Sequence, residues 1–89
     1  MRAIVTVIGK DRVGIIAEVS SLLAAHGVNI LDISQTVLRD YFTMIMLVDV
    51  SGCEESFVEL TKLLSDAGQA RDLVIRAQRE DIFNAMHRI

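Results

Sequence analysis

Gly9-Lys10-Asp11-Arg12-Val13-Gly14-Ile15-Ile16 joins an apolar, strand-like run over residues 2–8 to an amphipathic helical pattern. The segment predicts a turn between a strand and a helix, with its polar atoms at the helix N-terminus. Asp11 is expected to cap that helix, because an aspartate at this place accepts a hydrogen bond from a backbone N–H of the first turn. The first N–H groups of a helix have no partner within it, so the turn also suits a small anion. From the loop alone, capping is the preferred interpretation and ligand capture is the alternative.

Composition and charge restrict the class of protein. The chain has 89 residues, 52% of them hydrophobic, and no proline, which indicates one folded domain. Its net charge is −3 and its nine Lys and Arg residues are dispersed, so we expect no nucleic-acid binding. The single cysteine, Cys53, excludes an intramolecular disulfide and a zinc cluster within one chain. No apolar run approaches the roughly 20 residues of a membrane span, so no membrane association is expected and the cytoplasm is the simplest location.

The spacing of apolar residues predicts the helices and strands. Residues 2–8 carry β-branched side chains on both faces, as a central strand covered on both sides would. The helix after the turn has an unusually wide apolar arc, and Gly27 is expected to end it. Residues 28–38 and 42–50 are predicted to form two strands of a hairpin, with a β-bulge near Ile30-Leu31.

The second half of the chain predicts three further elements. Ser51 and Glu54 fit a capping box for a second helix, which is expected to end at Gly68. The remaining apolar patterns predict a fourth strand and a short terminal helix, on Leu73, Ile75 and Ala77 and on Ile82, Phe83, Met86 and Ile89.

The predicted order β-α-β-β-α-β indicates an α+β fold. It is a ferredoxin-like sandwich with a four-stranded antiparallel sheet, two helices on one face and a short C-terminal helix. We expect the domain to span residues 1–79 and a helical extension to span residues 80–89. The apolar second face of the sheet and the wide first helix exceed what one copy of this fold buries. Both surfaces are therefore predicted to be subunit contacts, most simply in a two-fold homodimer.

Nucleotide and RNA binding are not supported by the motifs. Gly9 and Gly14 are spaced like the glycines of a P-loop, but Ile15-Ile16 stand where Lys and Ser or Thr are required. The aromatic side chains on which an RNA-recognition sheet stacks bases are also missing.

Catalysis has little support, and no catalytic residue, cofactor or metal site is predicted. Glu54 and Glu55 follow Cys53 and would raise the pKa of its thiol, which argues against a nucleophile. The enzymatic alternative is similarity to acylphosphatases, which share this fold plan and use a loop Arg and a sheet Asn. Arg12 and Asn29 match those residue types, although the loop of that family is longer and richer in glycine.

Several motifs, taken in order, resemble an ACT domain. They are Asp11-Arg12-Val13-Gly14-Ile15-Ile16-Ala17, Leu22-Leu23, Gly27-Val28-Asn29-Ile30 and the Phe42-Met44-Met46 strand. The resemblance covers about residues 3–77. The chain resembles the small stand-alone bacterial ACT proteins, and is similar to the glycine cleavage system transcriptional repressor, which has two such domains.

The resemblance implies a regulatory module that binds a small amino acid at a dimer interface. In the family, ligands lie between the first strand–helix loop of one subunit and the start of the second strand of the other. The corresponding loop residues are Asp11, Arg12, Val13, Gly14 and Ile15, and the strand residues are Asn29 and Ile30. Many members carry proline at the place of Val13, so this chain has an additional N–H in the turn.

We therefore expect a non-enzymatic, cytoplasmic homodimer that binds a small amino acid or related metabolite and acts on a protein partner of unknown identity. The alternative is a pure dimerisation or protein-interaction module without a ligand.

Overall fold

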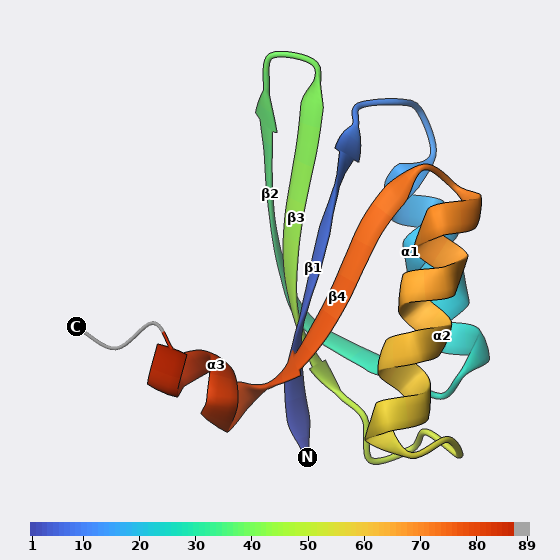
Figure 1. Cartoon of the computed structure of the whole chain (residues 1–89), viewed down its shortest axis with the longest axis vertical. Coiled ribbons are helices and arrows are strands. Elements are labelled where there is room, and N and C mark those ends of the chain that lie inside the picture. The colour runs from blue at the N-terminus through green and yellow to red at the C-terminus, as the bar shows by residue number, and fades with distance from the viewer. Residues whose placement is uncertain (87–89) are drawn as a thin grey trace.

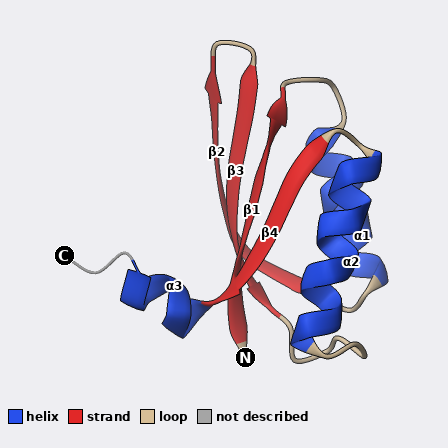
Figure 2. Ribbon diagram, viewed as in Figure 1, coloured by secondary structure: helices blue, strands red, loops and turns tan. Residues whose placement is uncertain are grey.

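The computed structural model of the protein describes residues 1–86. Its elements are β1 (Arg2–Lys10), α1 (Ile15–Ala25), β2 (Asn29–Leu38), β3 (Tyr41–Asp49), α2 (Phe57–Ala70), β4 (Leu73–Arg79) and α3 (Glu80–Met86). The strands form one antiparallel sheet in the order β2-β3-β1-β4. Helices α1 and α2 lie together on one face, whereas α3 projects to the other side of the sheet (Figure 1, Figure 2). The ferredoxin-like α+β prediction is confirmed.

The C-terminal helix forms as predicted over its described part. Ile89, which the sequence predicts on its apolar side, lies outside the described residues. The division into a domain of residues 1–79 and an extension of residues 80–89 stays a prediction.

The core lies between the sheet and its two covering helices. Helix α1 buries Ile15, Val19 and Leu23, and α2 buries Leu60 and Leu64. Their counterparts on the sheet are alternate residues of the three strands beneath the helices: Ala3, Val5, Val7, Phe42, Met44, Met46, Val48, Leu73 and Ile75. This alternation is the pattern of a sheet with one buried face. Residues 2–8 form an inner strand of the sheet, as predicted, and within this chain the helices α1 and α2 cover one of its two faces. The expected cover of the other face by a second subunit stays a prediction.

The face away from α1 and α2 is termed the open face. The strand register places on it the residues that alternate with the core, among them Ile4, Thr6 and Ile8 of β1, Thr43, Ile45 and Leu47 of β3, Val74 and Arg76 of β4, and Asp32 and Ser34 of β2. The opposite face is termed the helix-side face.

Strand β2 lies at the edge of the sheet, where α1 and α2 do not cover it. No residue of β2 is buried, and Ile33 and Val37 remain 40% and 53% exposed although they belong to the helix-side face. The predicted bulge is confirmed by a register shift between Ile30 and Asp32. It allows both Ile30 and Ile33 to lie on the helix-side face, because the extra residue restores the alternation.

Helix α2 begins later than the sequence indicated. Ser56 is its N-cap, and the Ser56 hydroxyl accepts a hydrogen bond from the backbone N–H of Glu59 at 3.2 Å. The predicted capping box of Ser51 and Glu54 is wrong. Gly68 does not end the helix either, because it is buried within α2, where a Cβ would meet the carbonyl oxygen of Leu73 at 2.8 Å.

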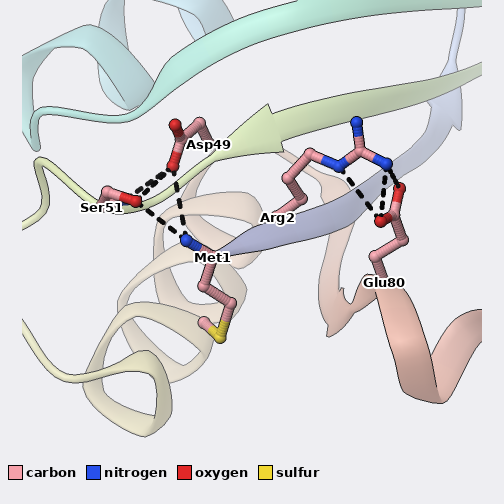
Figure 3. Close-up of polar contacts among 5 residues, drawn as sticks. All are labelled: Met1, Arg2, Asp49, Ser51 and Glu80. Atoms are coloured by element: carbon pink, nitrogen blue, oxygen red, sulfur yellow. Dashed lines mark hydrogen bonds and ion pairs between the residues drawn. The ribbon is translucent and has the colours of Figure 1, made fainter.

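Polar contacts tie the N-terminus to two later segments (Figure 3). The amino group of Met1 donates to the Ser51 hydroxyl at 2.8 Å and lies 3.7 Å from a carboxylate oxygen of Asp49. Arg2 donates from Nε and Nη2 to Glu80 at 3.0 and 2.8 Å, which joins β1 to the first residue of α3. The hydrogen bonds from Ser51 hold the pKa of Asp49 below its usual value.

Candidate functional site

The loop between β1 and α1 ends in an uncapped helix. Gly14 is the N-cap, with a left-handed φ of 94°, and no side chain hydrogen-bonds to the cap. The prediction that Asp11 caps α1 is wrong, because the helix begins after Gly14 and no side chain caps it. The backbone N–H of Asp11 donates to the carbonyl of Asp40 at 2.7 Å and ties the loop to the β2–β3 turn. Glycine suits position 14 because a residue without a Cβ adopts a left-handed backbone at little steric cost.

Three backbone N–H groups at the start of α1 are therefore available for a ligand. The first helical bond runs from the N–H of Glu18 to the carbonyl of Gly14 at 2.9 Å, so the N–H groups of Ile15, Ile16 and Ala17 have no acceptor within the helix. This end of the helix also carries the positive end of the helix dipole. Both properties favour a bound anion such as a carboxylate.

A hollow of about 280 Å³ opens at this helix end. It is bordered by the loop, the first turn of α1 and the helix-side face of the β2 edge, through Asp11, Arg12, Gly14, Ile15, Ile16, Ala17, Gln35, Val37 and Phe42. Gln35 is not among the site residues that the sequence predicts. Its position between Ile33 and Val37 makes it a polar residue in an apolar alternation, which is the sequence signal for a functional role.

The other loop residues have distinct environments. Arg12 forms an ion pair with Glu18, and its Nη2 lies 3.4 Å from the carbonyl oxygen of Arg71. Val13 is 99% exposed, whereas the Ile15 side chain is only 2% exposed and belongs to the core. Ile15 can therefore meet a ligand only through its backbone.

The two halves of the predicted site do not meet within one chain. Asn29 pairs with Asp49, which pairs with Arg2, whereas the loop follows Lys10 at the other end of the same ladder. The Asn29 side chain is exposed and Ile30 packs against the core. This separation also keeps Arg12 and Asn29 from forming the acylphosphatase-like pair within one chain.

Comparison with known proteins decides the family. A family model described as an ACT domain matches residues 2–78, which is most of the chain. The chain belongs to the ACT-domain family. Members of this family are typically regulatory amino-acid-binding modules.

Individual relatives agree with this assignment. A UPF0237 protein of Clostridium acetobutylicum is 54% identical over 89 residues, which are 100% of both chains. The solved ACT domain protein from Streptococcus pneumoniae is 46% identical with a TM-score of 0.83, and 98% of each chain is covered. A solved putative glycine cleavage system transcriptional repressor is 30% identical with a TM-score of 0.74, over 86% of this chain and 44% of that one.

This ACT domain has a second polar cluster, near the end of α1 distant from the loop. The Cys53 thiol donates to one carboxylate oxygen of Glu55 at 3.1 Å, and Nδ1 of His26 lies 2.8 Å from the other. Desolvation, followed by the contact with Glu55, raises the pKa of the Cys53 thiol. The thiol hydrogen bond is the main cause that lowers the pKa of Glu55. A raised thiol pKa leaves little thiolate, so Cys53 is a poor nucleophile.

Residues 1–86 of this ACT domain contain neither a metal-binding cluster nor a membrane-spanning helix. No set of three or more His, Cys, Asp and Glu side chains is arranged to hold a metal ion. None of the described helices has both the length and the apolar character needed to cross a membrane.

Proposed function

We propose that this ACT-domain protein is a non-enzymatic regulatory module that binds a small amino acid or related metabolite between two copies of the chain. The observation that supports this most is the uncapped N-terminus of α1, which opens into the hollow beside Gln35. The regulatory role is inferred from membership of the ACT-domain family. The hollow suits a small metabolite because its volume of about 280 Å³ is below that of typical drug-sized sites.

The polar groups around the hollow match both ends of an amino acid. The ligand carboxylate would accept hydrogen bonds from the N–H groups of Ile15, Ile16 and Ala17. Its ammonium group would lie toward the carboxylate of Asp11, which borders the same hollow. The Gln35 amide can donate to the carboxylate or accept from the ammonium.

The open edge of β2 supports a second copy as the other wall of the site. In an antiparallel pair of β2 strands around a two-fold axis, the start of one strand lies beside the end of the other. Leu38, at the end of β2, is at the same end of the sheet as the loop. This pairing would therefore bring Asn29 and Ile30 of the second copy toward the loop of the first and would cover the exposed Ile33 and Val37.

A ligand held by both copies would stabilise the paired state over the separated one. Its free energy of binding would be available to shift that equilibrium, and with it the surface that a regulated protein partner meets. We place this role in the cytoplasm, where a reducing environment suits a chain whose only cysteine is a free thiol.

Calorimetric titration with each of the twenty amino acids tests the proposal, using the intact protein and two variants at one position. Ile16→Pro removes one ligand-facing N–H without breaking a helical hydrogen bond, and proline is tolerated in the first turn. Ile16→Ala is the control because it shortens the side chain and keeps the N–H. We expect Ile16→Pro to weaken binding by about 10-fold or more, in line with a lost hydrogen bond to a charged group, and Ile16→Ala to weaken it much less.

Asn29→Ala tests the contribution from the second copy and should also weaken binding. Circular dichroism establishes that each variant is folded. If none of the twenty amino acids binds while the protein still associates, the amino-acid proposal fails and the pure interaction module is favoured. Equal losses in Ile16→Pro and Ile16→Ala would reject the helix N-terminus as the carboxylate site.

A further inference from the structure

We propose that the protein has a second ligand site, for a small phosphate monoester, between the β1–α1 loop and the α2–β4 turn. The site is a hollow of about 490 Å³ bordered by Lys10, Arg12, Arg71 and Asp72, and is termed the cationic hollow. Of these four residues only Arg12 also borders the hollow beside Gln35. Binding there requires neither the proposed amino acid nor a second copy of the chain.

The sheet brings the residues of the cationic hollow together from distant parts of the sequence. The last pair of the ladder between β1 and β4 is Gly9 with Leu73, so Lys10 and Asp72 are the next residues beyond it. The β1–α1 loop and the α2–β4 turn therefore lie side by side at one end of the molecule (Figure 1). This placement follows from the strand register and does not depend on a ligand.

The two guanidinium groups at the cationic hollow are held by other groups of the protein. Nη1 of Arg71 donates to the carbonyl of Ala67 at 2.9 Å, in the last turn of α2, and the side chain is partly buried. Arg12 pairs with Glu18, and its Nη2 lies 3.4 Å from the carbonyl oxygen of Arg71. A guanidinium group has five N–H donors, so both side chains keep donors for a ligand. Groups that are already ordered lose little freedom on binding, which favours a specific site.

The charges around the cationic hollow favour a ligand with two negative charges. Three of the four bordering residues are cations, and Lys10 and Arg71 take part in none of the ion pairs within residues 1–86. Neighbouring cations repel one another, and an anion placed among them removes that repulsion. A phosphate monoester carries about 1.5 to 2 negative charges at neutral pH, and its oxygens accept paired hydrogen bonds from a guanidinium group. A single carboxylate has less charge to offer.

The size of the hollow and the carboxylate of Asp72 indicate the rest of the ligand. A volume of about 490 Å³ lies within the range of small-molecule sites, so an organic group has room beside the phosphate. Asp72 would accept a hydrogen bond from a hydroxyl or ammonium group of that ligand. The same carboxylate would repel a second phosphate, which disfavours a nucleic-acid backbone. The ligand class is therefore a phosphate monoester with a hydroxyl or ammonium group.

Titrations of the intact protein followed by ¹H–¹⁵N NMR test the site with two probes, inorganic phosphate and phosphoethanolamine, a monoester with an ammonium group. We expect both to shift the backbone signals of the four bordering residues, and phosphoethanolamine to bind more tightly. Arg71→Gln should weaken the binding of both by about 10-fold or more, as for a lost hydrogen bond between charged groups. Lys62→Gln removes the same charge at an exposed position of α2 outside the hollow, and should change the affinity by less than about twofold.

Two further variants complete the test. Because Arg71 also bonds the end of α2, Lys10→Gln gives a second loss of charge at a residue that forms no ion pair within the described chain, and it should weaken phosphate binding by about threefold. Asp72 has a left-handed φ of 57°, which asparagine also adopts readily, so Asp72→Asn should keep the turn. It should strengthen the binding of inorganic phosphate and reduce the preference for phosphoethanolamine, each by about threefold.

The outcomes separate this site from the proposed amino-acid site. The proposal is overturned if neither probe binds saturably at millimolar concentration, or if Arg71→Gln and Lys62→Gln lose affinity equally. Signal shifts confined to Ile15, Ile16 and Ala17 would also overturn it, since they would place the anion at the start of α1. An amino-acid titration without binding would leave it standing, because those N–H groups take no part. Thermal unfolding of each variant establishes that a lost affinity is not lost folding.

Discussion

Gly14 and Gly27 both have left-handed backbones, but their surroundings differ. Gly14, with φ 94°, would place a Cβ in open space, whereas a Cβ on Gly27, with φ 74°, would meet the carbonyl oxygen of Gly52 at 2.4 Å. Gly14→Ala should therefore lower the free energy of unfolding by about 1–2 kcal/mol, the cost of a left-handed backbone for a residue with a Cβ. Gly27→Ala should cost clearly more, about 3 kcal/mol or above, because two loop backbones must also separate. Urea denaturation measures both, and equal losses would contradict the crowding argument.

Cys53 offers a second test with one residue. Burial and the contact with Glu55 raise the pKa of its thiol, so at neutral pH its alkylation is expected to be slow. Glu55→Gln removes a negative charge beside the sulfur and should speed the reaction with iodoacetamide by about threefold, because the pKa falls while the burial remains. Glu54→Gln is the control, since Glu54 acts on the thiol only as the weakest of its charge contributions. A slower reaction in Glu55→Gln would contradict this account.

The start of α2 shows where a local pattern is insufficient. Ser51 with Glu54 and Ser56 with Glu59 have the same spacing, but Ser51 is engaged by the Met1 amino group and by Asp49. Only Ser56 is free to cap, so the choice between them depends on contacts with the distant N-terminus. Asp11 likewise does not cap α1, which begins after Gly14, and its segment is tied to the β2–β3 turn.

Removal of the observed cap should have a defined cost. Ser56→Ala should lower the free energy of unfolding by about 1 kcal/mol, the usual loss for an N-cap serine. Ser65→Ala, at an exposed position within α2, is the control and should change it by less than about 0.5 kcal/mol. Chemical denaturation of both variants checks this, and a neutral Ser56→Ala would mean that the helix start is stabilised by packing alone.

Across the whole molecule, two carboxylates link stability to pH. The pKa values of Asp49 and Glu55 are lowered in the folded state, so both groups stabilise the fold above their unfolded values of about 3.8 and 4.5. This stabilisation is lost as the pH falls through the lower, folded pKa values. The free energy of unfolding should therefore decrease on acidification below about pH 4.5. Asp49→Asn and Glu55→Gln should each flatten that decrease, and an unchanged slope would reject the linkage.

The overall architecture follows from the sequence because its signals are long and periodic. Alternating residues such as Met44 and Met46 define the buried sheet face, and Gly27 marks the end of α1 as predicted. The sequence does not show which strands the helices cover, because that depends on how the sheet twists beneath them. Only the structure therefore shows that β2 is uncovered and that Gly14 and Asn29 lie at opposite ends of the sheet. The contribution of Gln35 to the hollow is likewise seen only in the structure.

The extra residue in β2 has a consequence for comparing related chains. Ile30 and Ile33 share a face only because one residue between them is unpaired with β3. Deletion of Leu31 would leave every later residue of β2 on its present face, because Asp32 already pairs with Leu47, the neighbour of the residue that pairs with Ile30. If Leu31 were retained and paired with Leu47 instead, every residue after it would change face, and Ile33, Gln35 and Val37 would turn away from the loop. A related chain that lacks one residue at this place can therefore keep the same lining of the hollow, whereas a chain of equal length without the bulge cannot.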